Sequence, residues 1–335
     1  MTARLGRSSV DVRSAGQDAQ RVGEVLSRSQ GTLTLADMFQ EGQLYAPVVT
    51  DADGEVTVHL AEDHPGFADA AYRDRRNTIA ALALDWQVGE PCPVAPYTDE
   101  EHEVWRVVRA ELAVQPERLA CRAAREGRAA LDLPLDRIPQ LDEVTAALAP
   151  LSGFEYRPAA GLVPLREFYG SLADRAFWST QYIRHHSVPL YTPEPDVVHE
   201  VIGHAITLAE PSYAALYVEA GRAARRVESD EALEFVSKVF WFSLEFGVVH
   251  EPDGPKAYGA GLLSSYGEIQ EFPEADLRPL DLARMGTQTY DITHYQPVLF
   301  AARSWDEVHD VVGGFFATAD DESVTRLLHD ASARV

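Results

Sequence analysis

The chain has 335 residues, of which 46% are hydrophobic and 24% are charged. These proportions are typical of soluble globular proteins and exclude disordered, collagen-like and coiled-coil chains. Lys and Arg contribute 29 positive charges and Asp and Glu contribute 53 negative ones, so the formal net charge is −24. Because such a charge repels phosphate backbones, we expect no nucleic-acid partner.

The chain carries two cysteines, Cys92 and Cys121, whose spacing is not that of a metal site. One possible disulfide does not make a secreted scaffold, so we expect unpaired thiols in a reducing compartment. The first residues include arginines but no apolar core, and no apolar run approaches the roughly 18 residues of a membrane span. These features predict a cytoplasmic protein without a membrane segment.

In chain order, residues 1–58 differ in composition from the rest and are expected to form an N-terminal arm or small cap, ending in a strand marked by Val56 and Val58. From residue 59 onward helical periodicity dominates. Residues 67–87 carry Ala and Leu on one face, and Thr98 with Glu101 forms a capping box before the next helix. We expect one mainly α catalytic domain with a few short strands over 59–318, and a short tail over 319–335.

The middle of the chain predicts further helices in close succession. Residues 166–178 read as a helix, followed by a β-rich stretch over 181–183. Asp196 is placed to cap or charge the start of a helix over 197–208. A second helix opens near Ser212, and a third begins near Ser229 and runs through residue 246.

The segment HEVIGH at residues 199–204 carries the most informative pattern. In zinc proteases two histidines one helical turn apart bind the metal, and a glutamate is the base. Here the histidines are five residues apart, which places them about 140° apart around an ideal α-helix. Either Gly203 and the helix end bring both imidazoles to one point, or one of them is a core histidine. A zinc hydrolase with Glu200 as its base is an alternative that this spacing disfavours.

Glu245 is the single carboxylate in the apolar segment 240–249. A charge buried there must be paired, protonated or bound to a metal. Two histidines and one carboxylate with open positions form the ligand set of non-haem Fe(II) oxygenases. A structural glutamate paired with another side chain is the alternative.

Arg184 lies in the segment QYIRHH at 181–186, ahead of the histidines. Its planar guanidinium is suited to hold a carboxylate through two hydrogen bonds, and a surface ion pair is the alternative. The segment GAG at 259–261 lacks the third glycine of a dinucleotide-binding loop. It predicts a turn that lets the backbone approach a site.

Several segments together resemble one known family. YTPEPD at 191–196 followed by HEVIGH at 199–204 is similar to the signature of the pterin-dependent aromatic amino acid hydroxylases. The resemblance covers residues 59–318 and includes further segments in the family's order: DHPGF at 63–67, YR at 72–73, IPQL at 138–141, RP at 157–158, GL at 161–162, TQYIRH at 180–185, WF at 241–242, EFG at 245–247, AYGAGLLSS at 257–265, Tyr290 and QP at 296–297.

The resemblance implies a mainly α catalytic fold of the aromatic amino acid hydroxylase type. It implies Fe(II) and a tetrahydropterin (tetrahydrobiopterin or a related pterin) as cofactors, O₂ as co-substrate, and hydroxylation of an aromatic amino acid ring. The implied residues are the metal ligands His199, His204 and Glu245; the substrate-binding residues Arg184, Thr192, Trp241, Ser264 and Glu268; and the pterin-binding residues Gly161, Val163, Phe168, Glu200 and Phe240. Glu200 is also the implied catalytic residue.

Departures from the family pattern concern the substrate. Trp241 favours a phenylalanine or tyrosine hydroxylase, and the acid that tyrosine hydroxylases carry at the position of Ile292 is here Asp291, one residue earlier. We expect phenylalanine as substrate and tyrosine or meta-tyrosine as product; a tyrosine or tryptophan hydroxylase is the alternative. Phe240 replaces a frequent tyrosine, and Trp178 a frequent smaller histidine near the ring pocket.

The resemblance also bears on assembly. Fewer residues precede position 59 than the regulatory domain of animal relatives needs, and the C-terminal end is too short for their helical assembly tail. We expect a monomer or dimer without that regulatory domain. A non-catalytic sensor of aromatic amino acids is an alternative of a different class.

Overall fold

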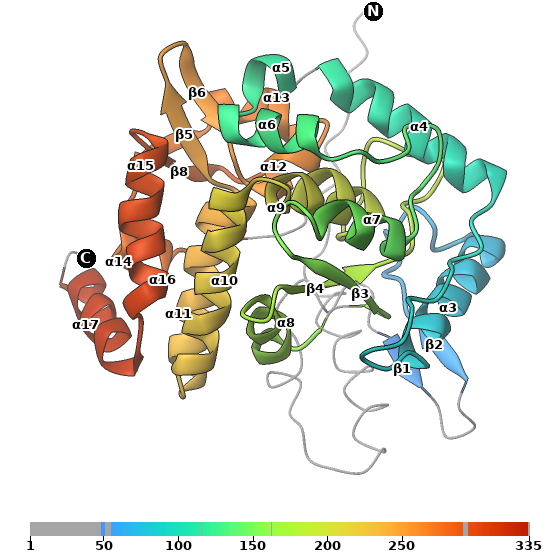
Figure 1. Cartoon of the computed structure of the whole chain (residues 1–335), viewed down its shortest axis with the longest axis horizontal. Helices are drawn as coiled ribbons and strands as arrows, with labels where there is room; N and C mark the ends of the chain where they lie inside the picture. The colour runs from blue at the N-terminus through green and yellow to red at the C-terminus, as the bar shows by residue number, and fades with distance from the viewer. Residues whose placement is uncertain (1–47, 51–54, 115, 162, 291–293, 334–335) are drawn as a thin grey trace, which may run out of the picture.

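The computed structural model describes residues 48–50, 55–114, 116–161, 163–290 and 294–333. Its described part is mainly α-helical with a few short strands, as the sequence predicts (Figure 1). No helix in the described ranges is long and apolar enough to cross a membrane.

The first described elements are a small antiparallel pair, β1 (Val48–Thr50) and β2 (Val56–Val58), followed by helix α3 (Ala70–Leu84). The expected strand at Val56 and Val58 is therefore confirmed. This hairpin packs on α3, because Val58 and Leu60 bury their side chains against Ala80. Residues 1–47 of the expected arm lie outside the described part.

The next segment is helical, with α4 (Asp99–Val114), α5 (Pro116–Leu119), α6 (Arg122–Ala130) and α7 (Leu141–Leu148). The capping box before α4 is confirmed: Thr98 Oγ1 accepts from the backbone N–H of Glu101 at 3.2 Å, and the Glu101 carboxylate accepts from the N–H of Thr98 at 2.7 Å. These two bonds satisfy donors that the first helical turn leaves free.

The expected helix over 166–178 is too long. Helix α8 (Leu165–Leu172) ends three residues before Arg175, which has a positive φ of 57°, and strand β4 (Ala176–Thr180) begins directly after Arg175. β4 pairs in parallel with β3 (Glu155–Ala159), with Tyr156 opposite Phe177. Strand pairing overrides local helix propensity here, and the β-rich stretch lies earlier than the expected 181–183.

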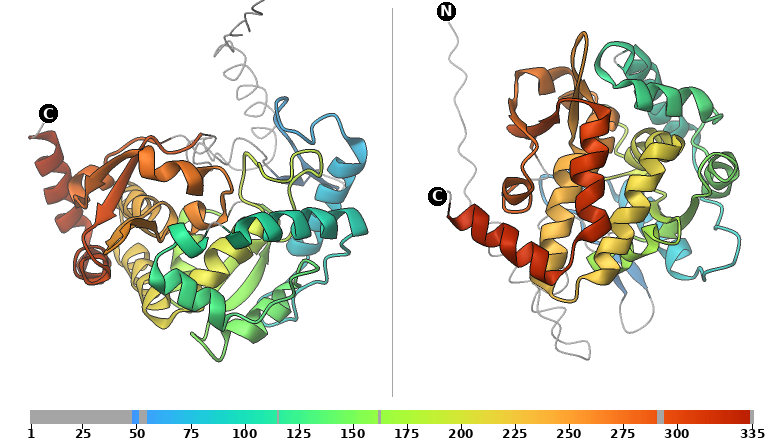
Figure 2. Two further views of the ribbon diagram at one scale, coloured as in Figure 1. Left: turned by 90° about the horizontal axis from the view of Figure 1, so that it is seen from above. Right: turned by 60° about the vertical axis from the view of Figure 1, so that its left-hand side comes forward.

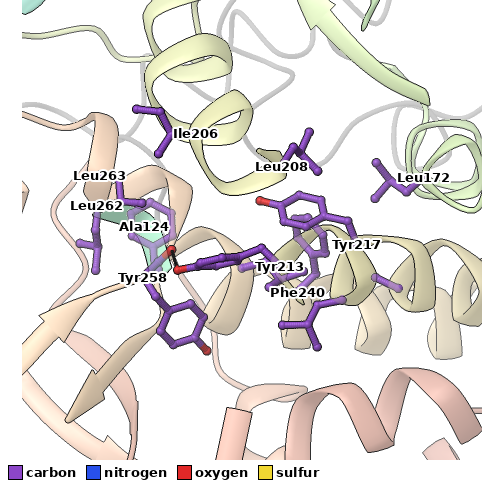
Figure 3. Close-up of a cluster of buried hydrophobic side chains, with 14 of the residues drawn as sticks. Ala124, Leu172, Ile206, Leu208, Tyr213, Tyr217, Phe240, Tyr258, Leu262 and Leu263 are labelled. Carbon is purple, nitrogen blue, oxygen red and sulfur yellow. Dashed lines mark hydrogen bonds between the residues drawn. The ribbon is translucent and has the colours of Figure 1, made fainter. Parts of the chain in front are cut away.

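The core of the molecule follows in the order π-helix η2 (His199–Ala205), α9 (Ile206–Leu208), α10 (Pro211–Arg226), α11 (Asp230–Phe240) and π-helix η3 (Trp241–Glu245). The expected cap at Ser229 is confirmed, since its side chain accepts from the N–H of Ala232. α10 begins after Glu210, whose side chain caps it, close to the expected start. Large aromatic side chains of α10 and α11 fill the space behind the two π-helices (Figure 3).

A four-stranded sheet and short helices complete the fold. The strand order is β6-β5-β8-β7, formed by β5 (Val248–Glu251), β6 (Gly254–Ala257), β7 (Asp276–Pro279) and β8 (Val298–Ala302). β5 runs antiparallel to β6 and parallel to β8. The helices that join these strands are α12 (Ala260–Ser264), α13 (Glu268–Glu271), the 3-10 turn η4 (Phe272–Glu274) and α14 (Leu282–Met285).

The C-terminal part is helical, and its last helix lies in the expected tail over 319–335. It comprises α15 (Trp305–Glu307), π-helix η5 (Val308–Gly313), α16 (Gly314–Thr318) and α17 (Asp321–Ser332). α16 lies along α10, and α17 contacts α11 and α14 at the edge of the molecule (Figure 2). Val324 of α17 is buried in the main core.

Candidate active site and metal centre

His199 and His204 meet because the backbone between them is π-helical. Residues 199–205 form η2, whose hydrogen bonds join residues five apart, so side chains at that spacing lie on one side of the turn. The two Nε2 atoms are 2.9 Å apart. The five-residue spacing that misfits an ideal α-helix therefore brings both imidazoles to one point.

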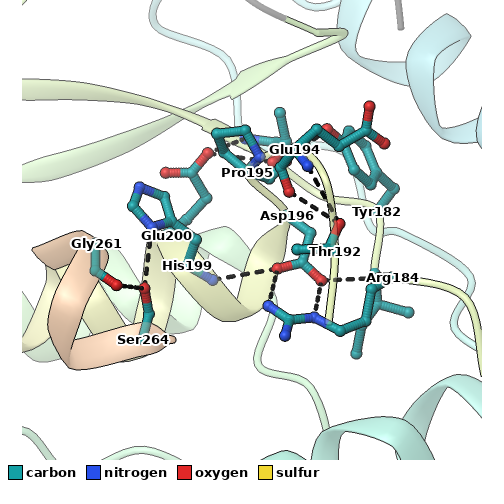
Figure 4. A network of polar contacts seen from close by, with 12 residues as sticks. Tyr182, Arg184, Thr192, Glu194, Pro195, Asp196, His199, Glu200, Gly261 and Ser264 are labelled. Atoms are coloured by element: carbon teal, nitrogen blue, oxygen red, sulfur yellow. Dashed lines mark hydrogen bonds and ion pairs between the residues drawn. The ribbon is translucent and has the colours of Figure 1, made fainter. Parts of the chain in front are cut away.

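Hydrogen bonds fix the same tautomer in both imidazoles. The Ser264 hydroxyl donates to the carbonyl of Ala260, so it accepts from Nδ1–H of His199 at 3.0 Å (Figure 4). The Thr207 hydroxyl donates to the carbonyl of His204, so the Tyr217 hydroxyl donates to Thr207 and accepts from Nδ1–H of His204 at 3.0 Å. Both Nε2 atoms are left with lone pairs that face each other.

Glu245 completes the cluster from η3. Its Oε1 lies 3.1 Å from Nε2 of His204, and its Oε2 lies 3.6 Å from Nε2 of His199. Oε2 is buried and has no hydrogen-bond partner in the described part of the chain. One atom from each of the three side chains therefore lies within 4.8 Å of the others.

This arrangement fits a divalent transition metal. Two ligand nitrogens about 2.1 Å from one metal and 90° apart are separated by about 3.0 Å. The observed separation of 2.9 Å matches this value. Two imidazole nitrogens and one carboxylate on one side of a metal leave positions open for small molecules, as in non-haem iron oxygenases.

The charges of the three side chains are coupled. Burial, with the neighbouring His204 as the second cause, lowers the pKa of His199 to about 4. Burial alone would also lower the pKa of His204, but the Glu245 carboxylate outweighs this effect and raises that pKa. Burial would raise the pKa of Glu245, yet His204 and His199 hold it below its usual value. The carboxylate and at least one neutral imidazole are thus available as ligands at neutral pH.

Two glycines let the ligand-bearing segments approach α12. A Cβ at Gly203 would lie 2.6 Å from the carbonyl oxygen of Ala260, and one at Gly259 would lie 2.2 Å from that of Glu245. No real side chain tolerates such contacts. The GAG segment at 259–261 therefore lets the backbone of α12 lie close to that of Glu245, as the sequence predicts.

Arg184 lies in the loop before η2 and is buried against Asp196. Its Nε donates to Oδ2 of Asp196 at 2.9 Å, and its Nη2 donates to Oδ1 at 2.8 Å (Figure 4). Asp196 also accepts from the N–H of His199, as a helix-start residue should. Arg184 therefore forms a buried ion pair rather than a surface one. Among the described residues, Nε and Nη2 bond to Asp196, and Nη1 is the guanidinium nitrogen left for a ligand.

Thr192 belongs to a loop that is anchored by the buried carboxylate of Glu194. Its hydroxyl donates to the carbonyl of Glu194 at 2.9 Å. The Glu194 carboxylate accepts from Arg76 at 2.6 Å and lies 3.3 Å from His64. The Thr192 hydroxyl therefore stabilises this loop. Its contact with the substrate stays a prediction.

Glu200 contacts β4 through Thr180 and lies near enough to His204 and Glu245 to feel their charges. Its Oε1 accepts from Thr180 Oγ1 at 3.2 Å, and burial raises its pKa to about 8. The group thus holds a proton over much of the neutral range, which suits a residue that donates or accepts protons near a cofactor.

The predicted pterin residues divide into two groups. Phe168 is half-buried and contacts Phe177, whose ring centre lies 4.6 Å from that of His204. The ring of Phe177 therefore lies between Phe168 and the metal ligand His204. Gly161 and Val163 directly precede α8 in the chain. Phe240 differs: it is 1% exposed and packs against Tyr169 and Tyr217. The structure places Phe240 behind the site, because the aromatic core surrounds it, and it offers no surface to a pterin.

Trp241, predicted to line the ring pocket, lies on η3 four residues before Glu245. Its indole stacks on Tyr290 at 4.3 Å and 16°, and its buried Nε1 has no hydrogen-bond partner within the described ranges. Glu268, the first residue of α13, is buried; its carboxylate accepts from the N–H of Gln296, and burial raises its pKa to about 7. Asp291 and Ile292 lie outside the described residues.

Trp178 lies away from the metal ligands. It neighbours Phe177 on β4, so the two side chains point to opposite faces of the strand. The indole of Trp178 packs edge-on against Trp86 at 5.9 Å. The structure therefore gives this position no direct part in shaping a ring pocket beside His204.

Sequence reasoning missed the residues that position the ligands. Tyr217 and Thr180 were not singled out for the site, and Asp196 was assigned only a role at a helix start. Tyr217 sits in an amphipathic pattern on α10 that reads as ordinary core. A buried tyrosine hydroxyl must have a hydrogen-bond partner, and this requirement was the available signal.

Comparisons with known proteins agree with this geometry. A phenylalanine 3-hydroxylase of Streptomyces coeruleorubidus is 50% identical over 272 residues, which cover 81% of this chain and 98% of that protein. Cattle phenylalanine-4-hydroxylase is 41% identical over 265 residues, and this chain spans 58% of its length. A structure of Chromobacterium violaceum phenylalanine hydroxylase with iron(III) and 7,8-dihydrobiopterin matches with a TM-score of 0.62 and 28% identity, covering 68% of this chain and 84% of that one.

Residues 47–326 match the family described as biopterin-dependent aromatic amino acid hydroxylase. This match includes every element that carries the metal-binding cluster, from the loop at Arg184 to η3. The chain belongs to the biopterin-dependent aromatic amino acid hydroxylases.

Proposed function

We propose that this enzyme hydroxylates the ring of L-phenylalanine and that its main product is meta-tyrosine. The observation that carries the proposal is the convergence of His199, His204 and Glu245, the last of which lies on the same short helix as Trp241. Both the Streptomyces 3-hydroxylase and the cattle 4-hydroxylase support phenylalanine as the substrate. The meta position is supported because this chain is 50% identical to the 3-hydroxylase and 41% identical to the 4-hydroxylase.

The metal in this proposal is Fe(II), held by His199, His204 and Glu245. With a reduced pterin and O₂, such an iron centre supplies the oxidising chemistry that transfers one oxygen atom to an aromatic ring. The side chains of the protein bind and orient the metal, the substrate and the pterin, and they exclude water from the site. Ser264 and Tyr217 hold the two imidazoles in the tautomer that points Nε2 at the metal.

Arg184 binds the substrate carboxylate in this proposal. Its guanidinium is held in position by the two bonds to Asp196. Nη1 then provides a charge-assisted hydrogen bond to the carboxylate. The aromatic ring of the substrate lies toward Trp241, whose rigid stack with Tyr290 limits how the ring can tilt.

Phe168 and Glu200 serve the pterin. Phe168 offers a half-buried ring face for a flat heterocycle, held edge-on by Phe177. Glu200 carries a proton on the oxygen opposite Oε1, because Oε1 accepts from Thr180 and the raised pKa favours the neutral acid. Such a group can donate a hydrogen bond to a ring nitrogen or carbonyl of the pterin.

Product analysis tests the proposed function directly. Purified protein with Fe(II), a tetrahydropterin and air is incubated with phenylalanine, tyrosine or tryptophan, and products are separated by chromatography. We expect meta-tyrosine from phenylalanine. Para-tyrosine would correct the ring position, product from tyrosine or tryptophan alone would correct the substrate, and no product from any of them would contradict the proposal.

We also propose a cytoplasmic enzyme that is a monomer or dimer. Both cysteines are free, Cys121 buried and Cys92 half-buried, which supports a reducing compartment. Light scattering of the purified protein tests the assembly state, and a larger assembly would contradict this proposal.

A further inference from the structure

A second cluster of metal-binding side chains lies outside the iron site, where the start of α3 meets the loop after Arg184. Asp69, His185 and His186 each offer a ligand atom within 4.8 Å of the others. The proposed hydroxylation uses none of these side chains. We propose that they form a second site for a divalent transition metal, with Zn²⁺ as the fitting ion.

The two inner ligands already have the separation that a metal requires. Nε2 of His185 lies 3.3 Å from Oδ2 of Asp69. Two ligands about 2.1 Å from a tetrahedral zinc ion are about 3.4 Å apart. A metal can therefore take the place of the proton between these atoms with little movement of either side chain.

Both inner side chains are held in position by hydrogen bonds to neighbouring groups. Asp69 caps α3, since its Oδ1 accepts from the N–H of Tyr72 at 3.1 Å, and this leaves Oδ2 directed at His185. Nδ1 of His185 lies 2.7 Å from the Ser187 hydroxyl. Nδ1 also accepts from the backbone N–H of Ser187 at 3.3 Å, so without a metal the proton lies on Nε2, toward Asp69. When a metal takes Nε2, the proton moves to Nδ1 and is donated to the Ser187 hydroxyl, which is the arrangement found around zinc-binding histidines.

His186 provides the third ligand and the access route. Its ring centre lies 4.2 Å from that of His185, and 41% of its side chain is exposed. It can therefore turn toward an ion that enters from solvent. Glu100, at the start of α4, lies 3.5 Å from Nδ1 of His186 and adds negative charge beside the site.

The donor set indicates zinc rather than a hard cation. Imidazole nitrogens suit Zn²⁺, Cu²⁺ and Ni²⁺, whereas Mg²⁺ and Ca²⁺ take oxygen ligands. Three protein ligands with a water in the fourth position form a common zinc geometry. An ion bound here links the start of α3 to the loop next to Arg184.

Metal counting on the iron-loaded enzyme tests the site. The enzyme is dialysed without oxygen against chelator-buffered Zn²⁺, and iron and zinc per chain are measured by mass spectrometry. We expect one iron and one zinc in the wild type, and iron alone in His186→Ala and Asp69→Asn. The zinc Kd of each variant should rise at least about tenfold.

Two features keep the result interpretable. Asparagine caps helices as well as aspartate does, so Asp69→Asn should keep its melting temperature while it loses zinc. His329→Ala, at an exposed histidine of α17, is the matched control and should keep its zinc. Zinc that displaces iron at one metal per chain, an absence of bound zinc, or zinc retained by both site variants would overturn the proposal.

Discussion

The hydroxyl of Tyr217 should control iron affinity although it touches no metal. Tyr217 is fully buried, and its hydroxyl lies 3.0 Å from Nδ1 of His204 and 3.1 Å from Oγ1 of Thr207. Tyr217→Phe removes the acceptor that keeps the proton of His204 on Nδ1. Loss of such an outer partner lowers metal affinity by about 10- to 100-fold, which corresponds to about 1.4–2.8 kcal/mol.

The chain offers a matched control for this change. Tyr213 lies on the same helix, is equally buried, and donates its hydroxyl to the carbonyl of Tyr258 at 2.9 Å, away from the iron ligands (Figure 3). Both Tyr→Phe variants lose a buried hydrogen bond and should lose similar stability, about 1–3 kcal/mol. Anaerobic Fe(II) titration should show weakened binding in Tyr217→Phe alone. Equal iron affinities in the two variants would refute the role assigned to Tyr217.

Three further predictions concern charged groups. Glu245→Gln should lower Fe(II) affinity at least about tenfold, and metal analysis that finds full iron content would remove Glu245 from the ligand set. Arg184→Lys should raise the KM for phenylalanine far more than the KM for pterin, because an ammonium cannot keep both bonds to Asp196 and also place a donor for substrate; equal rises would assign Arg184 another role. The pKa of Glu268 is raised from 4.5 to about 7, so the folded state binds its proton more tightly and the free energy of unfolding should fall by about 3 kcal/mol as pH rises through this window. Denaturant titrations of Glu268→Gln should lack this contribution, and an unchanged pH dependence would contradict the assignment.

Several parts of this structure could be predicted because their causes are local. The caps at Thr98 and Ser229 follow from side chains that satisfy free N–H groups of a first helical turn. The alternation at Val56 and Val58 gave the strand before α3. Length and apolar periodicity indicated a mainly helical domain.

Other parts depend on contacts between distant segments. The spacing of His199 and His204 contradicts an ideal α-helix, and only the π-helical backbone of η2 resolves the conflict. The register of backbone hydrogen bonds has no clear signature in side-chain pattern, so this turn could not be read from the sequence. Residues 173–178 were assigned to a helix because the pairing of β4 with β3, which outweighs local propensity, is non-local.

The candidate site shows the same division. Motif resemblance named the three metal ligands and Arg184, whereas the bond between Arg184 and Asp196 depends on a loop held by Glu194 and Arg76. Phe240 was assigned to the pterin by position in a motif. Its burial between Tyr169 and Tyr217 is a packing outcome that a motif does not encode.

The most direct test of the account is the position of the iron itself. Crystals soaked anaerobically with Fe(II) and measured on both sides of the iron absorption edge give an anomalous difference map. The account predicts one peak about 2.1 Å from Nε2 of His199 and of His204, in contact with the carboxylate of Glu245. A map without a peak there, or with iron bound elsewhere, would contradict the claim that these three side chains form the catalytic metal centre.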